Sequence, residues 1–150
     1  NVIVLRTLSK AFALAGLRCG FTLASKEIIT LLSKVIAPYP ISAPVAEIAS
    51  KALSTDLDEM AQRVQCCNSI KATLSTWLNA QDWCSEVFIS NANFILFRCI
   101  NPQEKERIFD TLVAQDILIR DQSKQMQLAN CLRISIGSEQ EITQLKEVLS

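Results

Sequence analysis

A lysine that follows two hydroxyl residues and precedes an arginine gives this chain its clearest potential for chemistry. Thr7 and Ser9 precede Lys10 closely. Arg18 comes eight residues after the lysine. An unprotonated amine can condense with an aldehyde, and a nearby guanidinium or partial desolvation favours that neutral form. The forked donors of an arginine suit a phosphate, and hydroxyls can complete the hydrogen bonds of its oxygens. The alternative, from the residues alone, is a solvated lysine at a strand end and an ordinary surface arginine.

A second candidate for anion binding lies towards the C-terminus. Apolar and polar residues alternate over residues 132–136, so Arg133 and Ser135 are expected on one face of a strand. An arginine can bind a carboxylate through two parallel hydrogen bonds. A half-buried strand with a solvated outer face explains the same pattern. Arg120 is a further cation, which the adjacent Asp121 could instead neutralise.

The elements around Lys10 and Arg18 are expected to bring them together. Apolar runs predict strands at residues 2–5 and 18–24, and the first is typical of a strand buried on both faces. A connection of about ten residues lets two consecutive strands end at one edge of a sheet. Lys10 and Arg18 would then face the same crevice.

The rest of the chain predicts helices followed by a compact α/β unit. Helices are expected at residues 25–36, from Ser42, and from Thr55, whose T-x-x-D spacing is typical of a capping box. Capped helices are also expected to begin at Asn101 and Ser138. The expected strands of this unit are 87–90, 94–99, 117–120 and 132–136.

Composition excludes several classes of function. The chain has no histidine, which rules out a Ser-His-Asp triad or a Cys-His pair within it, and only three glycines, too few for a glycine-rich phosphate loop. Its 15 basic and 15 acidic residues form no basic stripe for nucleic acid, and no apolar run approaches the roughly 20 residues needed to cross a membrane. Six cysteines without C-x-x-C spacing favour reduced, mostly buried thiols in a cytoplasmic protein, rather than disulfides or a metal site.

Two strings at the start of the chain carry a resemblance to a known family. RTLSKAF at residues 6–12 and LAGLRCG at residues 14–20 resemble the signature of the pyridoxal-phosphate-dependent aminotransferases of fold type I. Within class II of that family they are most similar to the histidinol-phosphate aminotransferases. The resemblance implies pyridoxal 5'-phosphate (PLP) as the cofactor and no metal.

The same resemblance implies roles at the cofactor. Lys10 is the catalytic lysine, which holds the PLP aldehyde and then moves a proton between the substrate α-carbon and C4′ of the cofactor. Arg18 binds the PLP phosphate, and Thr7 and Ser9 are the hydroxyl positions beside it. Lysine therefore takes the acid–base role for which the chain has no histidine.

The resemblance also implies contacts with the substrate. Arg133, in the string LRISIG at residues 132–137, would bind the substrate α-carboxylate. Arg120 would help to recognise the phosphate of an amino-phosphate substrate. Tyr39 and Asn93 resemble positions near the mouth of the active site, although packing explains Tyr39 equally well and a plain turn explains Asn93.

The implied fold class is α/β, as the C-terminal part of a fold type I transferase. Residues 1–40 would end the PLP-binding large domain, residues 41–80 would form a helical interdomain segment, and residues 81–150 would form a small C-terminal α/β domain. The implied reaction is amino transfer between histidinol phosphate and 2-oxoglutarate, or the reverse from imidazole-acetol phosphate and glutamate, in histidine biosynthesis. Family members of this kind are homodimers. The alternatives are a related PLP enzyme, such as a threonine-phosphate decarboxylase or another aminotransferase, and the aminotransferase-like sensor domain of a transcription regulator.

The chain is also expected to be a piece of a longer protein, because it begins within a strand and without methionine. In the family, an earlier segment supplies the aspartate that pairs with the pyridine nitrogen and most of the contacts around the cofactor ring. Residues 1–150 alone are therefore expected to be inactive and to bind PLP weakly or not at all.

Overall fold

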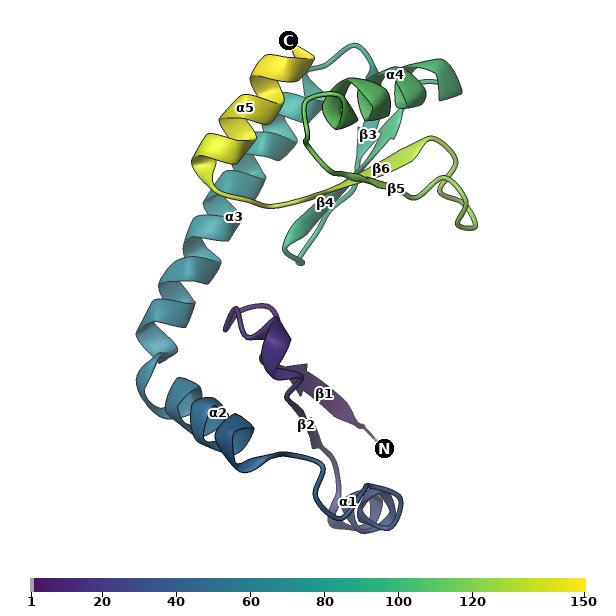
Figure 1. Cartoon of the computed structure of the whole chain (residues 1–150). Coiled ribbons are helices and arrows are strands. Elements are labelled where there is room, and N and C mark those ends of the chain that lie inside the picture. The colour runs from purple at the N-terminus through teal and green to yellow at the C-terminus, as the bar shows by residue number, and fades with distance from the viewer. Residues whose placement is uncertain (1) are drawn as a thin grey trace. The chain divides into compact units, whose positions relative to one another are not determined.

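The computed structural model describes residues 2–150, which divide into two compact units (Figure 1). The first unit extends to Val64, and the second comprises Gln65–Ser150. The boundary falls inside a long helix, α3 (Leu57–Asn79). The fold is mixed α/β, as expected.

The first unit begins with an antiparallel pair of strands, β1 (Val4–Thr7) and β2 (Gly20–Leu23). Thr7 lies opposite Gly20, so residues 8–19 form the connection beyond one end of this pair. A Cβ at position 20 would come 2.7 Å from the Arg6 carbonyl oxygen, which explains why glycine begins β2. The pairing of Thr7 with Gly20 confirms that the two strands end at one edge. The strand predicted at 18–24 begins only at Gly20, because Arg18 ends a short 3₁₀ turn, so Arg18 lies in the connection with Lys10.

The expectation that the first strand is buried on both faces is wrong for this chain. All four residues of β1 are exposed, and the side chain of Leu5 is 75% exposed. The physical reason is that β1 has an extensive contact only with β2 among residues 2–150, along its edge, so no helix layer covers either of its faces there.

Three helices follow in order: α1 (Lys26–Ser33), α2 (Ala43–Thr55) and α3. Ser42 occupies the N-cap position of α2, where the sequence predicts the helix to begin, but its side chain makes no capping hydrogen bond within residues 2–150. Pro44 lies in the first turn. The capping box predicted at Thr55 does not form, because the Thr55 hydroxyl donates back to the carbonyl of Lys51 within α2. Asp56 separates the two helices, and α3 begins one residue later.

The second unit contains a four-stranded antiparallel sheet in the order β3-β4-β6-β5. Its strands are β3 (Cys84–Val87), β4 (Phe94–Cys99), β5 (Arg120–Asp121) and β6 (Cys131–Ser135). Two helices, α4 (Pro102–Val113) and α5 (Glu139–Leu149), pack against the sheet together with the end of α3. The core between them is apolar and includes Phe97, Leu132 and Ile134, each at most 2% exposed.

Both predicted caps of this unit are confirmed. The Asn101 side chain accepts a hydrogen bond of 2.8 Å from the backbone N–H of Glu104, with proline in the first turn of α4. Ser138 and Glu141 form a reciprocal capping box at the start of α5. The backbone hydrogen bond from Ser138 to the Glu141 carboxylate is the main cause that lowers the pKa of Glu141.

Two predicted strands of this unit are displaced or shortened. The strand predicted at 87–90 lies earlier, at β3, because the Ser90 hydroxyl bonds to the Phe94 carbonyl at 2.6 Å and turns the chain there. The strand predicted at 117–120 is reduced to β5. Its first half is tied to the end of α4, where the Ile117 N–H donates to the Leu112 carbonyl.

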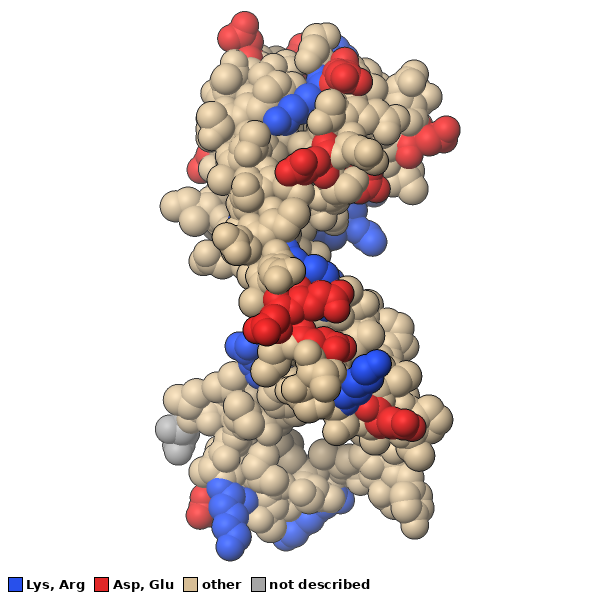
Figure 2. Space-filling model, turned by 90° about the vertical axis from the view of Figure 1, so that its left-hand side faces the viewer, with Lys and Arg blue, Asp and Glu red and all other residues tan. Residues whose placement is uncertain are grey.

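All six cysteines are free thiols, as expected, but they are not mostly buried. Cys99 and Cys131 are buried, whereas Cys66 is exposed on α3. Burial raises the pKa of Cys99 to about 12. Among residues 2–150, no helix is long and apolar enough to span a membrane. On the face shown in Figure 2, acidic and basic residues are interspersed among uncharged ones.

Candidate functional site: a lysine loop and a pair of arginines

The loop that carries Lys10 is folded back on itself by its own backbone. Leu8, directly after β1, is only 1% exposed. Its N–H donates to the Cys19 carbonyl at 3.2 Å, and its carbonyl accepts from the N–H of Leu14 at 3.0 Å. Leu8, buried and held by two backbone hydrogen bonds, therefore anchors the chain two positions before the lysine.

The two predicted hydroxyls lie next to each other at the entrance to this loop. Thr7 Oγ1 and Ser9 Oγ are 2.9 Å apart, with the threonine as donor. The backbone N–H of Ser9 donates to Thr7 Oγ1 at 3.1 Å. The Thr7 hydroxyl uses its single proton in this contact, whereas the Ser9 hydroxyl can still donate, since a hydroxyl donates once and accepts twice. The pair can thus serve a phosphate, the role that the sequence predicts.

Lys10 and Arg18 are both exposed and bracket a strained stretch of backbone. The Lys10 carbonyl accepts from the N–H of Ala13, and Ala13 adopts a positive φ of 57°. Arg18 ends the short 3₁₀ helix η1 (Ala15–Leu17), also in the left-handed region, with φ 51° and ψ 33°. Such conformations cost a non-glycine residue about 1–2 kcal/mol and are frequent at functional sites.

The side chains of the two cations remain available for a ligand. Arg18 Nη1 donates to the Ala15 carbonyl at 3.3 Å, which leaves most of the guanidinium N–H groups unbonded among residues 2–150. The Lys10 amine has neither a hydrogen bond nor an ion pair within that same range. The loop therefore offers an amine, a guanidinium and two hydroxyls.

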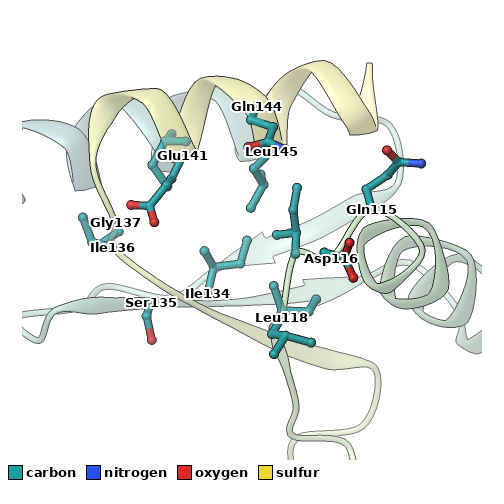
Figure 3. Close-up of a pocket in the computed structure, with 13 residues that line it drawn as sticks. Gln115, Asp116, Leu118, Ile134, Ser135, Ile136, Gly137, Glu141, Gln144 and Leu145 are labelled. Carbon is teal, nitrogen blue, oxygen red and sulfur yellow. The ribbon is translucent and has the colours of Figure 1, made fainter.

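In the second unit, β6 has the alternation that the sequence predicts. Leu132 and Ile134 are buried, Arg133 is half-buried, and Ser135 is exposed. Figure 3 shows Ile134 on the α5 side of β6 and the Ser135 hydroxyl on the opposite side. Arg133 is therefore on the outer face of the sheet.

Arg120 lies directly opposite Arg133 across the β5–β6 pair. Residues opposite each other in an antiparallel pair share a face, so both arginines belong to the outer face. Neither has a carboxylate within ion-pair distance among residues 2–150. Two cations on one face, without an ion pair among residues 2–150, are suited to an anion with more than one negative charge.

The possibility that Asp121 neutralises Arg120 is not realised. Asp121 bonds instead to Lys105 of α4, at 3.1 Å, and to the N–H and hydroxyl of Ser123. Burial alone would raise the pKa of Asp121, but these hydrogen bonds, with the Lys105 charge, lower it. The carboxylate is thus committed to other partners.

An aromatic contact of Arg133 is the feature that sequence analysis did not identify. The Arg133 guanidinium carbon lies 4.9 Å from the centroid of the Phe94 ring. Arg133 Nε is buried and has no hydrogen-bond partner among residues 2–150. The contact joins β4 to β6, so it depends on strand register, which no local pattern in the sequence specifies.

The other two predicted substrate residues lie in exposed positions. Tyr39 is 94% exposed in the loop between α1 and α2. Asn93 is exposed just before β4, and its carbonyl accepts from the N–H of Ile136 at 2.9 Å. No hydrogen bond of either side chain occurs within residues 2–150.

A pocket of about 390 Å³ in the second unit does not coincide with these residues (Figure 3). It lies beside α5 and the last residues of β6 and is lined mainly by aliphatic side chains, with Asp116 and Glu141 contributing carboxylates. Neither Arg120 nor Arg133 lines it. Because its charged groups are acidic, it does not suit an anionic substrate.

Comparison with known proteins identifies the family. The model of the family "Aminotransferase class I and II" matches residues 1–149. The chain belongs to the class I and II aminotransferases. It is 71% identical over 149 residues to a histidinol-phosphate aminotransferase from Colwellia psychrerythraea, a match that covers 99% of this chain and 40% of that protein. The chain thus spans about two fifths of the length of this relative.

Two solved structures support the fold assignment. The crystal structure of a histidinol-phosphate aminotransferase from Clostridium acetobutylicum matches this chain with a TM-score of 0.86 and 26% sequence identity. The match covers 98% of this chain and 44% of that protein's chain. The crystal structure of a histidinol-phosphate aminotransferase from Sinorhizobium meliloti, in complex with pyridoxal-5'-phosphate, has a TM-score of 0.78 and 25% identity. This match covers 99% of this chain and 40% of the Sinorhizobium meliloti chain.

The residues of the loop fit PLP chemically. PLP carries an aldehyde, which an amine can attack, and a phosphate, which needs several donors. The end of β1 and the loop after it supply the Lys10 amine, which has no bond among residues 2–150, the largely unbonded guanidinium of Arg18, and the hydroxyl pair of Thr7 and Ser9.

Proposed function

We propose that the polypeptide to which this chain belongs is a PLP-dependent histidinol-phosphate aminotransferase. The observation that carries the proposal is that the end of β1 and the loop between β1 and β2 together hold one amine, one guanidinium and a hydroxyl pair. The 71% identity to a protein of that name supports the same reaction. The proposed reaction transfers an amino group between histidinol phosphate and 2-oxoglutarate, in histidine biosynthesis.

The first unit would hold the cofactor. The Lys10 amine would bond to the PLP aldehyde, and Arg18, Thr7 and Ser9 would bind the phosphate. When bound, PLP supplies the electron sink that stabilises negative charge at the substrate carbon bearing the amine. Once released by the substrate amine, the Lys10 amine would take the proton from that carbon. The strained backbone around Ala13 and Arg18 would keep the lysine and the guanidinium oriented.

The second unit would bind the anionic end of the substrate. Histidinol phosphate carries a phosphate and glutamate carries carboxylates, so one cationic site can serve both halves of the reaction. Arg133 would bind the α-carboxylate of glutamate, and Arg120 would add the charge that a dianionic phosphate needs. Tyr39 and Asn93 are proposed at the mouth of the active site, where their exposed side chains are free to contact substrate.

We also propose the domain organisation and setting that the family implies. Residues 1–40 would complete a PLP-binding domain, residues 41–80 would link it to the small domain at 81–150, and the whole protein would be a homodimer. Six free thiols are consistent with a reducing, cytoplasmic location.

The test is an assay of the full-length polypeptide with PLP, histidinol phosphate and 2-oxoglutarate. The expected result is glutamate formation that depends on both substrates. Release of carbon dioxide from threonine phosphate, with no turnover of the first pair, would instead assign a decarboxylase. Turnover of neither, together with a DNA-binding domain upstream in the same polypeptide, would assign a sensor.

A further inference from the structure

We propose that Phe94 is a positioning residue, which holds the Arg133 guanidinium in place for the anionic group of the substrate. This inference rests on the proposed function of Arg133. It adds a residue that neither the family motif nor the sequence pattern singles out.

Strand register gives the Phe94 ring room to contact Arg133. On the outer face, Phe94 lies opposite Ser135, and Arg133 lies opposite Leu96. Arg133 is thus the diagonal neighbour of Phe94, within reach of a long side chain. Because Ser135 is small, the ring face stays open, and the guanidinium carbon lies 4.9 Å from the ring centroid.

Electrostatics explains why Arg133 needs such a contact. Arg120, directly opposite on β5, repels it, and no carboxylate within residues 2–150 pairs with it. Its Nε is buried and finds no hydrogen-bond partner in the described part of the chain, residues 2–150. The negative face of an aromatic ring attracts a guanidinium within about 6 Å. Phe94 therefore draws Arg133 towards β4 without using the N–H groups that an anion would bind.

A second arginine on the same sheet provides an internal comparison. The Arg98 guanidinium carbon lies 5.4 Å from the centroid of the Phe88 ring. Arg98 also donates to the carbonyls of Ala129 and Gln127, at 2.5 and 3.2 Å, and pairs with Glu86 at 3.4 Å. Since these partners fix the Arg98 side chain, its ring contact is redundant.

The test compares Phe94→Leu, Phe94→Tyr and the control Phe88→Leu in the full-length polypeptide loaded with PLP. For Phe94→Leu we expect KM for histidinol phosphate, and the inhibition constant of inorganic phosphate, to rise about fivefold, with kcat within about twofold of the original. Phe94→Tyr keeps the ring face and should restore both constants. Phe88→Leu should change neither.

The outcomes separate this inference from the proposed function. Equal constants for Phe94→Leu and Phe88→Leu would overturn the positioning role. So would a Tyr variant that behaves like the Leu variant, or a fall in kcat as large as the rise in KM. Absence of turnover in the unsubstituted protein would overturn the proposed function. Even then, phosphate binding that is weaker in Phe94→Leu but unchanged in Phe94→Tyr and Phe88→Leu would support the positioning of Arg133.

Discussion

Replacing Arg120 by glutamine should stabilise the unliganded chain and weaken its binding of anions. Arg120 and Arg133 lie directly opposite each other on β5 and β6, with no carboxylate paired to either within residues 2–150. Like charges in such positions destabilise a sheet. Arg120→Gln removes the repulsion and keeps a side chain of similar length.

The size of the effect follows from Coulomb's law. Two unit charges separated like the Cβ atoms of opposite residues, by about 5 Å, repel by about 0.8 kcal/mol in water, and this is an upper bound because the Arg133 guanidinium leans towards Phe94 on β4. Because Arg120 is exposed, screening and side-chain motion reduce this, so we expect a gain of about 0.3–0.8 kcal/mol in the free energy of unfolding. For a chain of this length that corresponds to a rise of about 1–3 °C in Tm.

Tryptophan fluorescence can follow the relevant unit selectively. Trp77 and Trp83 are the two tryptophans of the chain, and both lie in the second unit, with ring centroids 5.9 Å apart. Thermal unfolding of Arg120→Gln should be measured in low salt and in about 0.5 M salt, where the Debye length is far shorter and the gain should shrink. Arg107→Gln is the matched control, because Arg107 pairs favourably with Glu104 at 2.7 Å, so its loss should not stabilise.

A lower Tm for Arg120→Gln, or a gain in Tm that does not depend on salt, would refute the repulsion between Arg120 and Arg133. In the full-length polypeptide the same variant should raise the inhibition constant of inorganic phosphate by about tenfold, since a charge-assisted hydrogen bond is worth about 1.5–3 kcal/mol. A more stable variant with unchanged phosphate inhibition would remove Arg120 from the anion site.

Three further predictions concern the second unit. Ser138→Ala removes the capping box of α5 and should lower the free energy of unfolding by about 1 kcal/mol, measured by urea denaturation. The lowered pKa of Asp121, which reflects its hydrogen bonds from Ser123, contributes stability that is present above the ordinary carboxyl pKa of 3.8 and lost as the pH falls below it. Asp121→Asn should therefore flatten the loss of stability between about pH 5 and 3. Iodoacetamide at pH 8 should label Cys66 first and leave Cys99 unlabelled in the folded chain, because burial raises the pKa of Cys99 to about 12, and peptide mass spectrometry would show the order.

Local signals in the sequence predict those parts of the structure that local interactions determine. The caps at Asn101 and Ser138 form as predicted, because each uses a side chain and a backbone group only three residues apart. The alternation at residues 132–136 also holds, because one face of β6 packs on a helix layer. The loop that carries Lys10 and Arg18 was also predictable, because two apolar runs separated by about ten residues indicate two paired strands with a loop between them.

Features that depend on competing bonds or on register could not be predicted in this way. Thr55 has the spacing of a capping residue, but its hydroxyl bonds within the preceding helix. Asp121 is adjacent to Arg120 in sequence, but successive residues of a strand point to opposite faces of the sheet. Asp121 therefore points away from Arg120 and pairs with Lys105 of α4. The contact of Phe94 with Arg133 requires the β4–β6 register, which is a property of the folded sheet.

The most direct test of the central claim is to locate the residue that bonds covalently to PLP. The full-length polypeptide would be loaded with PLP, reduced with sodium borohydride and digested, and the modified peptide identified by mass spectrometry. We expect the label on Lys10, its loss in Lys10→Ala, and its retention in the control Lys34→Ala, which changes an exposed lysine at the end of α1. A label on another lysine, or retention of the label in Lys10→Ala, would contradict the account.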